Sequence, residues 1–167
     1  MELAVKVVLK AYPADSIKDA GPWIGTVWKI DAGPAAGKMR TLHEVEHEIL
    51  RPMGEPLIHG AIVCASLSCP DLRQEAFRAD KVTEQMKDQT RKFLANRDKG
   101  ARLENGNLYI SSIFDWFAED FEETHGTVKE FVKQYAPEEI ASQINSDTSI
   151  YHMDYDWSLN DTKRLNN

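Results

Sequence analysis

The stretch Arg102-Leu103-Glu104-Asn105-Gly106-Asn107-Leu108-Tyr109-Ile110 carries the clearest fold signal in the sequence. Asn105-Gly106 favours the two-residue turn between antiparallel strands, because both residues readily adopt the positive φ angles of that turn. The apolar and aromatic residues on either side are typical of strands. The stretch therefore predicts a β-hairpin.

Helical patterns lie on both sides of this hairpin. Apolar residues recur at helical spacing, and charged residues occupy the remaining positions. Two of the segments open with a capping box, Thr41 with Glu44 and Thr127 with Glu130. Helices are expected over 1–11, 16–19, 41–50, 80–95 and 113–123, from Thr127 and from Pro137.

Further strands complete the expected fold. The residues 23–30 are rich in β-branched and aromatic types and predict a strand, followed by a turn over 31–37. The residues 151–157 alternate between two faces, as a strand does, whereas 57–64 fits a buried strand or a helix. Helices and hairpins without regular βαβ alternation predict a single α+β domain over 1–167, with about six helices on a small, mainly antiparallel sheet.

Composition restricts the classes of partner. The 167 residues are 42% hydrophobic and 28% charged, as in ordinary globular domains. The net charge of −7 argues against nucleic acid and anionic membrane surfaces as main partners. No apolar run reaches the roughly 20 residues that a membrane-spanning helix needs, so we expect no membrane insertion. The expected partner is a small molecule or a peptide.

The first ten residues carry charges within their apolar portion, unlike a signal peptide. They are typical of a helix already under way that lacks an N-cap. We therefore expect a chain that is truncated at its N-terminus, and such a chain indicates nothing about its compartment.

The segment His43-Glu44-Val45-Glu46-His47 matches H-E-x-x-H, the zinc-protease pattern. That chemistry requires both histidines and the first glutamate to face one cleft. A helical wheel at about 100° per residue turns Glu44 away from the apolar face, and no third ligand is evident. The same wheel places Glu46 within the apolar face, where a carboxylate needs a cation or donors. Glu46 is thus expected to be largely buried, in a salt bridge (for example to Arg51) or orienting a histidine.

A third group of residues consists of His59, Cys64 and Cys69. The two cysteines, five residues apart, fit a small disulfide loop, a pair of metal ligands or two reduced thiols. A thiol nucleophile needs a base that lowers its pKa, usually a histidine. Pro70 could open a helix whose N-terminus stabilises a thiolate on Cys69. The alternative is that Cys64 is a small buried hydrophobic residue and His59 an ordinary core histidine.

The polar face of the expected last strand carries Asp154 and Asp156. This face is either exposed to solvent or lines a polar cleft.

Several stretches together resemble the family catalogued as domain of unknown function 547. They are 12–19, 45–52, 111–121, 155–160 and, most specifically, 59–72 with its H-x-A-x-x-C-A-S-x-S-C-P pattern. The resemblance implies that an Asn-Ala-Tyr segment usual before the first helix is missing here. It also implies ordinary acidic helix positions at His43 and Glu44, which weakens the zinc-protease interpretation. The family has no established activity, and its bacterial members resemble exported proteins, which implies a periplasmic or exported origin.

Three functional hypotheses follow. The first is a thiol hydrolase or acyltransferase of the cysteine-protease or transglutaminase type. The second is a non-catalytic binding or scaffold module, in which the same residues form a closed structural network. The third is a metal site built from His47, His59 and the cysteines. The first two require no cofactor or metal, and none is expected. In the first, the nucleophile is Cys64 or Cys69, the base His59 and the orienting carboxylate Glu46 or Asp156.

Overall fold

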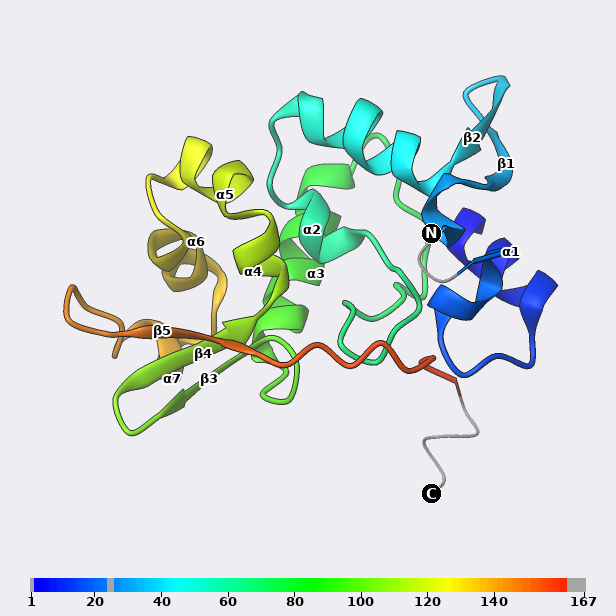
Figure 1. Cartoon of the computed structure of the whole chain (residues 1–167). Helices are drawn as coiled ribbons and strands as arrows, with labels where there is room; N and C mark the ends of the chain where they lie inside the picture. Colours follow the sequence, from blue (N-terminus) through cyan, green and yellow to red (C-terminus); the bar gives the residue numbers. More distant parts are fainter. Residues whose placement is uncertain (1, 24–25, 162–167) are drawn as a thin grey trace. The chain divides into compact units, whose positions relative to one another are not determined.

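A computed structural model describes residues 2–23 and 26–161 of the chain. These residues form helices and two small sheets, so the expected α+β class is confirmed (Figure 1). The contacts divide the chain into two compact units. Unit 1 holds the described residues of Met1–Met53, Val63–Cys69 and Asp156–Asn167, and unit 2 holds Gly54–Ile62 and Pro70–Tyr155. The assignment of 1–167 to one domain stays a prediction.

Unit 1 combines short helices with a two-stranded antiparallel sheet, β1–β2. Its buried cluster is small and consists of Val7, Ile17, Val27 and Ala32, with partly buried neighbours that include Trp28 and Trp157. Its elements are α1 (Glu2–Ala11), η1 (Ile17–Ala20), η2 (Val27–Lys29), β1 (Asp31–Ala35), β2 (Lys38–Thr41), η3 (Glu44–Leu50) and η4 (Arg51–Met53).

Side-chain hydrogen bonds of the capping type lie at the start of two of these elements, and the sequence predicts the second of them. Ser16 caps η1, where its hydroxyl accepts the Lys18 N–H at 3.2 Å. The Thr41–Glu44 capping box is confirmed, because the Glu44 N–H donates to Thr41 Oγ1 at 3.0 Å and the Thr41 N–H donates to Glu44 Oε2 at 2.8 Å. The helix that follows, η3, is a π-helix.

The strand expected over 23–30 is wrong where the structure describes it. The Thr26 hydroxyl donates to the Trp23 carbonyl at 2.7 Å, and a 3₁₀ turn over Val27–Lys29 follows. Such local side-chain bonds compete with strand pairing. Residues 24–25 lie outside the described part. The strand begins only at Asp31, so most of the turn expected over 31–37 is part of β1. The turn itself consists of Ala36 and Gly37, with φ of 49° and 77°.

Unit 2 contains a three-stranded sheet in the order β3-β4-β5 and α3, the longest helix of the described residues (Figure 1). Strands β3 and β4 are antiparallel, and β5 lies parallel to β4. The elements are α2 (Ile58–Ala61), α3 (Val82–Ala95), β3 (Ala101–Glu104), β4 (Asn107–Ser111), α4 (Ile113–Trp116), α5 (Ala118–His125), α6 (Val128–Tyr135), α7 (Glu138–Ala141) and β5 (Ile150–Met153).

The central hairpin is confirmed. Asn105 and Gly106 have φ of 53° and 77°, the left-handed values that the two-residue turn requires. The expected last strand joins this sheet but ends at Met153, and it pairs with β4 in parallel rather than antiparallel. The chain passes through the helices α4–α7 between β4 and β5, and a parallel pair needs such a long crossover.

The core of unit 2 is rich in aromatic residues. Phe114, Phe121 and Phe131 pack together, with ring centroids 4.6 to 6.0 Å apart. The helix expected over 113–123 is divided at Phe117, whose φ of −121° and ψ of 27° are not helical. The ambiguous run 57–64 contains a helix, α2, which contacts α3 closely. A Cβ on Gly60 would lie 3.0 Å from the Thr90 Cα, so only glycine fits there.

Candidate functional site

The two cysteines of unit 1 are reduced and in direct contact. Their Sγ atoms are 2.8 Å apart, and the Cys64 N–H donates to Cys69 Sγ, also at 2.8 Å. The Ser66 hydroxyl lies 3.1 Å from Cys64 Sγ. Cys69 is only 3% exposed, whereas Cys64 is half-buried. The segment therefore presents one partly accessible thiol that is backed by a buried one.

The loop between the cysteines is fixed by backbone pairing with residues 156–160. The Leu67 N–H donates to the Ser158 carbonyl at 2.8 Å, and the Ser68 N–H donates to the Asp156 carbonyl at 3.2 Å. Asp156 returns a bond from its own N–H to Ser68 Oγ at 2.9 Å. One carboxylate oxygen of Asp156 accepts the Ser158 N–H at 2.8 Å. These bonds of Asp156 shape the backbone beside the thiols.

In unit 2, His59 lies on α2 and is bound to an acidic side chain of α5. Its Nε2 is 2.7 Å from Asp120 Oδ2. The ring stacks on Phe117, at 4.3 Å between centroids, and tilts against Phe121 at 5.2 Å. His59 is 4% exposed, so its orientation is firmly held. A carboxylate only accepts hydrogen bonds, so Nε2 carries the hydrogen of this bond.

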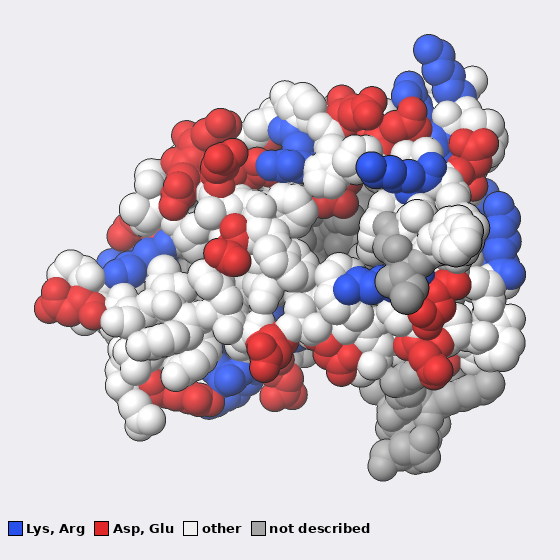
Figure 2. Space-filling model, in the orientation of Figure 1, with Lys and Arg blue, Asp and Glu red and all other residues white. Residues whose placement is uncertain are grey.

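Sequence reasoning missed Asp120. It belongs to a run of acids with Glu119, Glu122 and Glu123, which is typical of a solvated helix face, and Figure 2 shows acidic side chains gathered over α5. One signal could have found it, because Asp120 lies within the stretch 111–121 that carries the family resemblance.

Residues of the H-E-x-x-H segment bind a backbone N–H and an arginine side chain. Glu44 caps its own helix through Thr41, and His47 Nδ1 accepts a hydrogen bond from Arg51 at 3.1 Å. Arginine stays protonated in proteins, which makes this histidine nitrogen a poor metal ligand. Within residues 2–23 and 26–161, no group of three His, Cys, Asp or Glu side chains is placed to hold a metal ion.

Glu46 is half-buried, less than the sequence predicts. The helical wheel assumed about 100° per residue, whereas the i→i+5 bonding of a π-helix turns each residue through a smaller angle. The side chains of η3 therefore spread differently around its axis, and none of its residues is fully buried.

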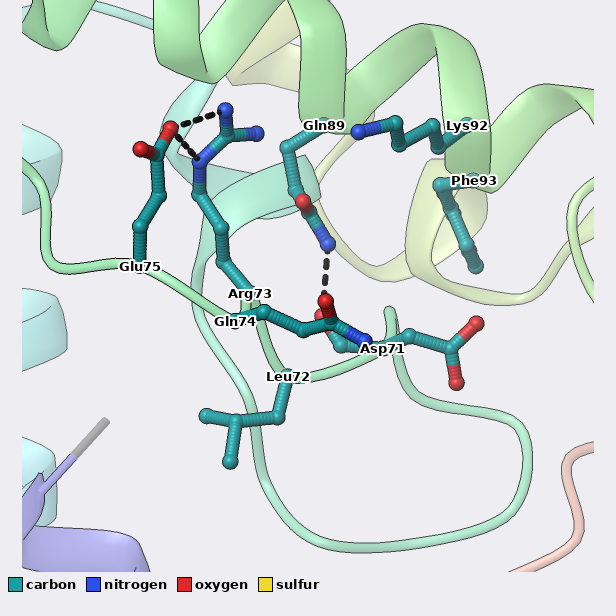
Figure 3. A pocket seen from close by; sticks show the side chains of 8 residues that line it. All are labelled: Asp71, Leu72, Arg73, Gln74, Glu75, Gln89, Lys92 and Phe93. Atoms are coloured by element: carbon teal, nitrogen blue, oxygen red, sulfur yellow. Dashed lines mark hydrogen bonds and ion pairs between the residues drawn. The ribbon is translucent and has the colours of Figure 1, made fainter.

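An open pocket of about 560 Å³ lies in unit 2, between the extended segment 71–75 and α3 (Figure 3). Leu72, 52% exposed, projects away from the helix at its edge, and the Gln89 amide donates to the Asp71 carbonyl. The prediction of a helix that begins at Pro70 is therefore wrong, because this segment is extended. The pocket is lined by Asp71, Leu72, Arg73, Gln74, Glu75, Gln89, Lys92 and Phe93.

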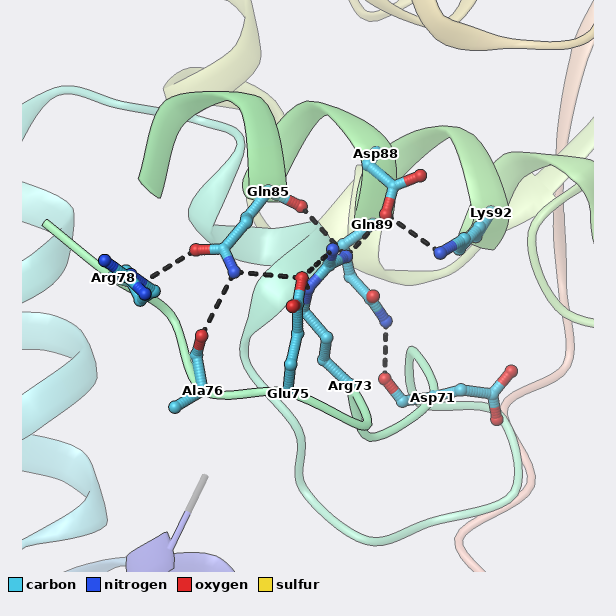
Figure 4. A network of polar contacts seen from close by, with 9 residues as sticks. All are labelled: Asp71, Arg73, Glu75, Ala76, Arg78, Gln85, Asp88, Gln89 and Lys92. Carbon is cyan, nitrogen blue, oxygen red and sulfur yellow. Dashed lines mark hydrogen bonds and ion pairs between the residues drawn. The ribbon is translucent and has the colours of Figure 1, made fainter. Parts of the chain in front are cut away.

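Side chains of α3 hold this extended segment in place (Figure 4). Arg73 binds Asp88 of the helix and Glu75 of the segment, the latter at 2.6 Å. The Gln85 amide donates to the Ala76 carbonyl at 3.0 Å. The hydrogen bond from Arg73 holds the pKa of Asp88 below its usual value, and the same cause lowers the pKa of Glu75. The network therefore replaces the backbone bonds that a helix would have made.

These features describe an α+β chain with a dithiol loop in one unit and a histidine–carboxylate pair in the other. A family model described as protein of unknown function, DUF547, matches residues 4–94, more than half of the chain. The chain belongs to this family. No curated protein and no solved structure shows a significant match to it. Among the described residues, no helix combines the length and the apolar character needed to cross a membrane.

Proposed function

We propose that this protein is a thiol-dependent hydrolase or acyltransferase, with Cys64 as nucleophile and His59 as base. The observation that carries the proposal is the 2.7 Å bond between His59 Nε2 and Asp120. A base oriented by a third group is the recurrent partner of a thiol nucleophile. The acyl donor would be a small molecule or a peptide.

Accessibility favours Cys64 over Cys69 as the nucleophile. A substrate carbonyl must reach the sulfur, and Cys69 is 3% exposed whereas Cys64 is only half-buried. Cys69 then has a supporting role, because its sulfur accepts the Cys64 N–H and fixes the position of the nucleophile's backbone.

The proton transfer follows from the tautomer of His59. With Nε2 engaged by Asp120, the thiol proton passes to Nδ1. The Cys64 thiolate attacks the acyl carbon, and the leaving amine or alcohol takes the proton from the imidazolium. Water or a second nucleophile then cleaves the thioester. Four residues separate His59 from Cys64, which limits their Cα–Cα distance to about 18 Å at most.

Asp120 takes the orienting role in this proposal, in place of Glu46 or Asp156. Its carboxylate is bound to the histidine ring itself. The Asp156 carboxylate accepts a backbone N–H of its own turn.

Alkylation by iodoacetamide at a series of pH values tests the proposal. Cys64 should react well below pH 8, since a thiolate paired with a base is the reactive form and a free thiol ionises near pH 8.5. His59→Asn and Asp120→Asn should slow this reaction at pH 6 by about tenfold or more. His125→Asn, a histidine of α5 outside the proposed site, is the matched control and should change nothing.

The same measurement can overturn the proposal. If Cys64 reacts no faster than a free thiol and His59→Asn has no effect, the thiol is not activated by this histidine. The scaffold alternative would then stand. It has its own support, because His59 is buried and stacked on Phe117 as a core residue is.

A further inference from the structure

The contact between the two thiols suggests a second chemistry. We propose that Cys64 and Cys69 form a reversible disulfide on exposure to hydrogen peroxide or an alkyl hydroperoxide. In the reduced protein their sulfurs are 2.8 Å apart. A disulfide bond is about 2.05 Å long, so the sulfurs need to approach by only about 0.8 Å.

The loop keeps the thiols together. Leu67 and Ser68 are paired through their backbones with Ser158 and Asp156, and the Cys69 N–H donates to the Ser66 carbonyl at 3.1 Å. Ser66 is completely buried between the cysteines. The surrounding fold therefore holds the two sulfurs in contact, at the distance from which a disulfide can form.

The difference in exposure assigns a role to each thiol. Peroxide reaches the half-buried Cys64, whose thiolate attacks one peroxide oxygen and becomes a sulfenic acid, while the second oxygen leaves as water or an alcohol. The buried Cys69 then attacks the Cys64 sulfur, and the sulfenic oxygen leaves as water. Overall, two thiols are oxidised to a disulfide, and one hydrogen peroxide is reduced to two waters.

Formation of this disulfide does not depend on the proposed acyl transfer, whereas its consequence does. If Cys64 is the nucleophile, oxidation removes the thiol and stops the reaction until a dithiol reductant restores it. The segment would then serve as both a catalytic site and an oxidant-sensitive switch.

Intact-protein mass spectrometry after a peroxide pulse tests the inference. The wild-type protein should lose two hydrogens, about 2 Da, and regain them with dithiothreitol. Cys69→Ser should instead accumulate a sulfenic acid on Cys64 that dimedone traps. Cys64→Ser should oxidise at least about tenfold more slowly than wild type, since its remaining thiol is buried.

Three outcomes would overturn the inference. They are a wild-type protein that stays reduced, one that proceeds to sulfinic acid without the disulfide, and a Cys69→Ser variant that gives no dimedone adduct. Far-UV circular dichroism of each reduced variant shows that it is folded. Alkylation of the reduced wild type reports on the acyl-transfer proposal separately, so failure of one proposal is distinguishable from failure of the other.

Discussion

Each of the two units is stabilised internally by a different kind of interaction. Unit 2 buries a continuous aromatic and aliphatic cluster that includes Phe114, Phe121 and Phe131. The buried cluster of unit 1 is far smaller, and its loops are joined by backbone bonds such as that from Leu67 to Ser158. Burial of apolar area is the dominant favourable term in folding, so the two units should respond differently to the same kind of mutation.

This difference matters for the candidate residues. His59 is packed among the aromatic rings of unit 2, whereas Cys64 lies on a loop of unit 1. We infer that the two halves of the proposed pair are held differently, the base by side-chain packing and the thiol by the hydrogen bonds of its loop.

The largest expected effect comes from matched isoleucine truncations. Ile110 of unit 2 and Ile17 of unit 1 are both fully buried. Ile110→Ala should lower the free energy of unfolding by about 4 kcal/mol and Ile17→Ala by about 2 kcal/mol, within the usual range of about 2–5. The smaller cluster can collapse around the lost methyl groups more completely. Urea denaturation of both variants measures this, and an equal loss would remove the contrast between the units.

Helix caps give the next largest effect. Thr127 of unit 2 makes a cap bond to the Glu130 N–H at 3.1 Å, whereas Ser16 of unit 1 both caps η1 and donates to the Trp157 carbonyl at 2.7 Å. Thr127→Ala should destabilise by about 1 kcal/mol, and Ser16→Ala by up to about 2, because it also loses a long-range bond. Thermal melts of the two variants would contradict this ordering if Thr127→Ala were the worse.

A smaller, stabilising effect is expected at Thr90 of α3. Its hydroxyl is buried and has no hydrogen-bond partner among the residues that the structure describes, and the packing gap beside it is too small for a water molecule. Thr90→Val replaces an unsatisfied polar group with a methyl group and should raise the free energy of unfolding by about 0.5–1 kcal/mol. Thr90→Ser, which keeps the hydroxyl and removes the methyl, is the matched control and should destabilise.

The smallest effect concerns acid stability. The hydrogen bond from Arg73 lowers the pKa of Asp88, and that from Lys6 lowers the pKa of Glu2. A carboxyl group whose pKa is lower in the folded state stabilises the fold above its unfolded pKa, near 3.9 for Asp, and this contribution is lost as the pH falls through the folded pKa. Asp88→Asn should therefore remove a few tenths of a kcal/mol at pH 7 and flatten the loss of stability below pH 4.

Glu2→Gln in unit 1 is the comparison for this effect. The Glu2 side chain is 79% exposed and that of Asp88 42% exposed, so solvent screens the first pair more strongly. Glu2→Gln should leave the acid unfolding curve unchanged. A clear shift of that curve would show that exposure does not rank these two ion pairs.

Local signals predicted two features of unit 2. Asn105-Gly106 specified its hairpin and Thr127 the start of α6, because a turn or a cap is determined by a few neighbouring residues. The strand expected over 23–30 failed where Thr26 bonds to Trp23, a local competition that β-propensity does not register.

Contacts between residues far apart in the chain could not be predicted from the sequence. Asp120 meets His59 across 61 positions, and Ser68 meets Asp156 across 88. The residue types at 59, 64 and 69 indicated thiol chemistry, yet nothing local could assign the carboxylate that holds the histidine. The parallel pairing of β5 likewise depends on the path through four helices.

The bond between Ser68 and Asp156 also sets an order of events during synthesis. The ribosome adds residues at about 5–20 per second, so the 88 positions between them correspond to several seconds or more. Throughout that interval Cys64 and Cys69 are already part of the chain, whereas the segment 156–160 that will fix their loop is not yet complete. Both thiols are thus present in the nascent chain for seconds before the segment that positions them has been added.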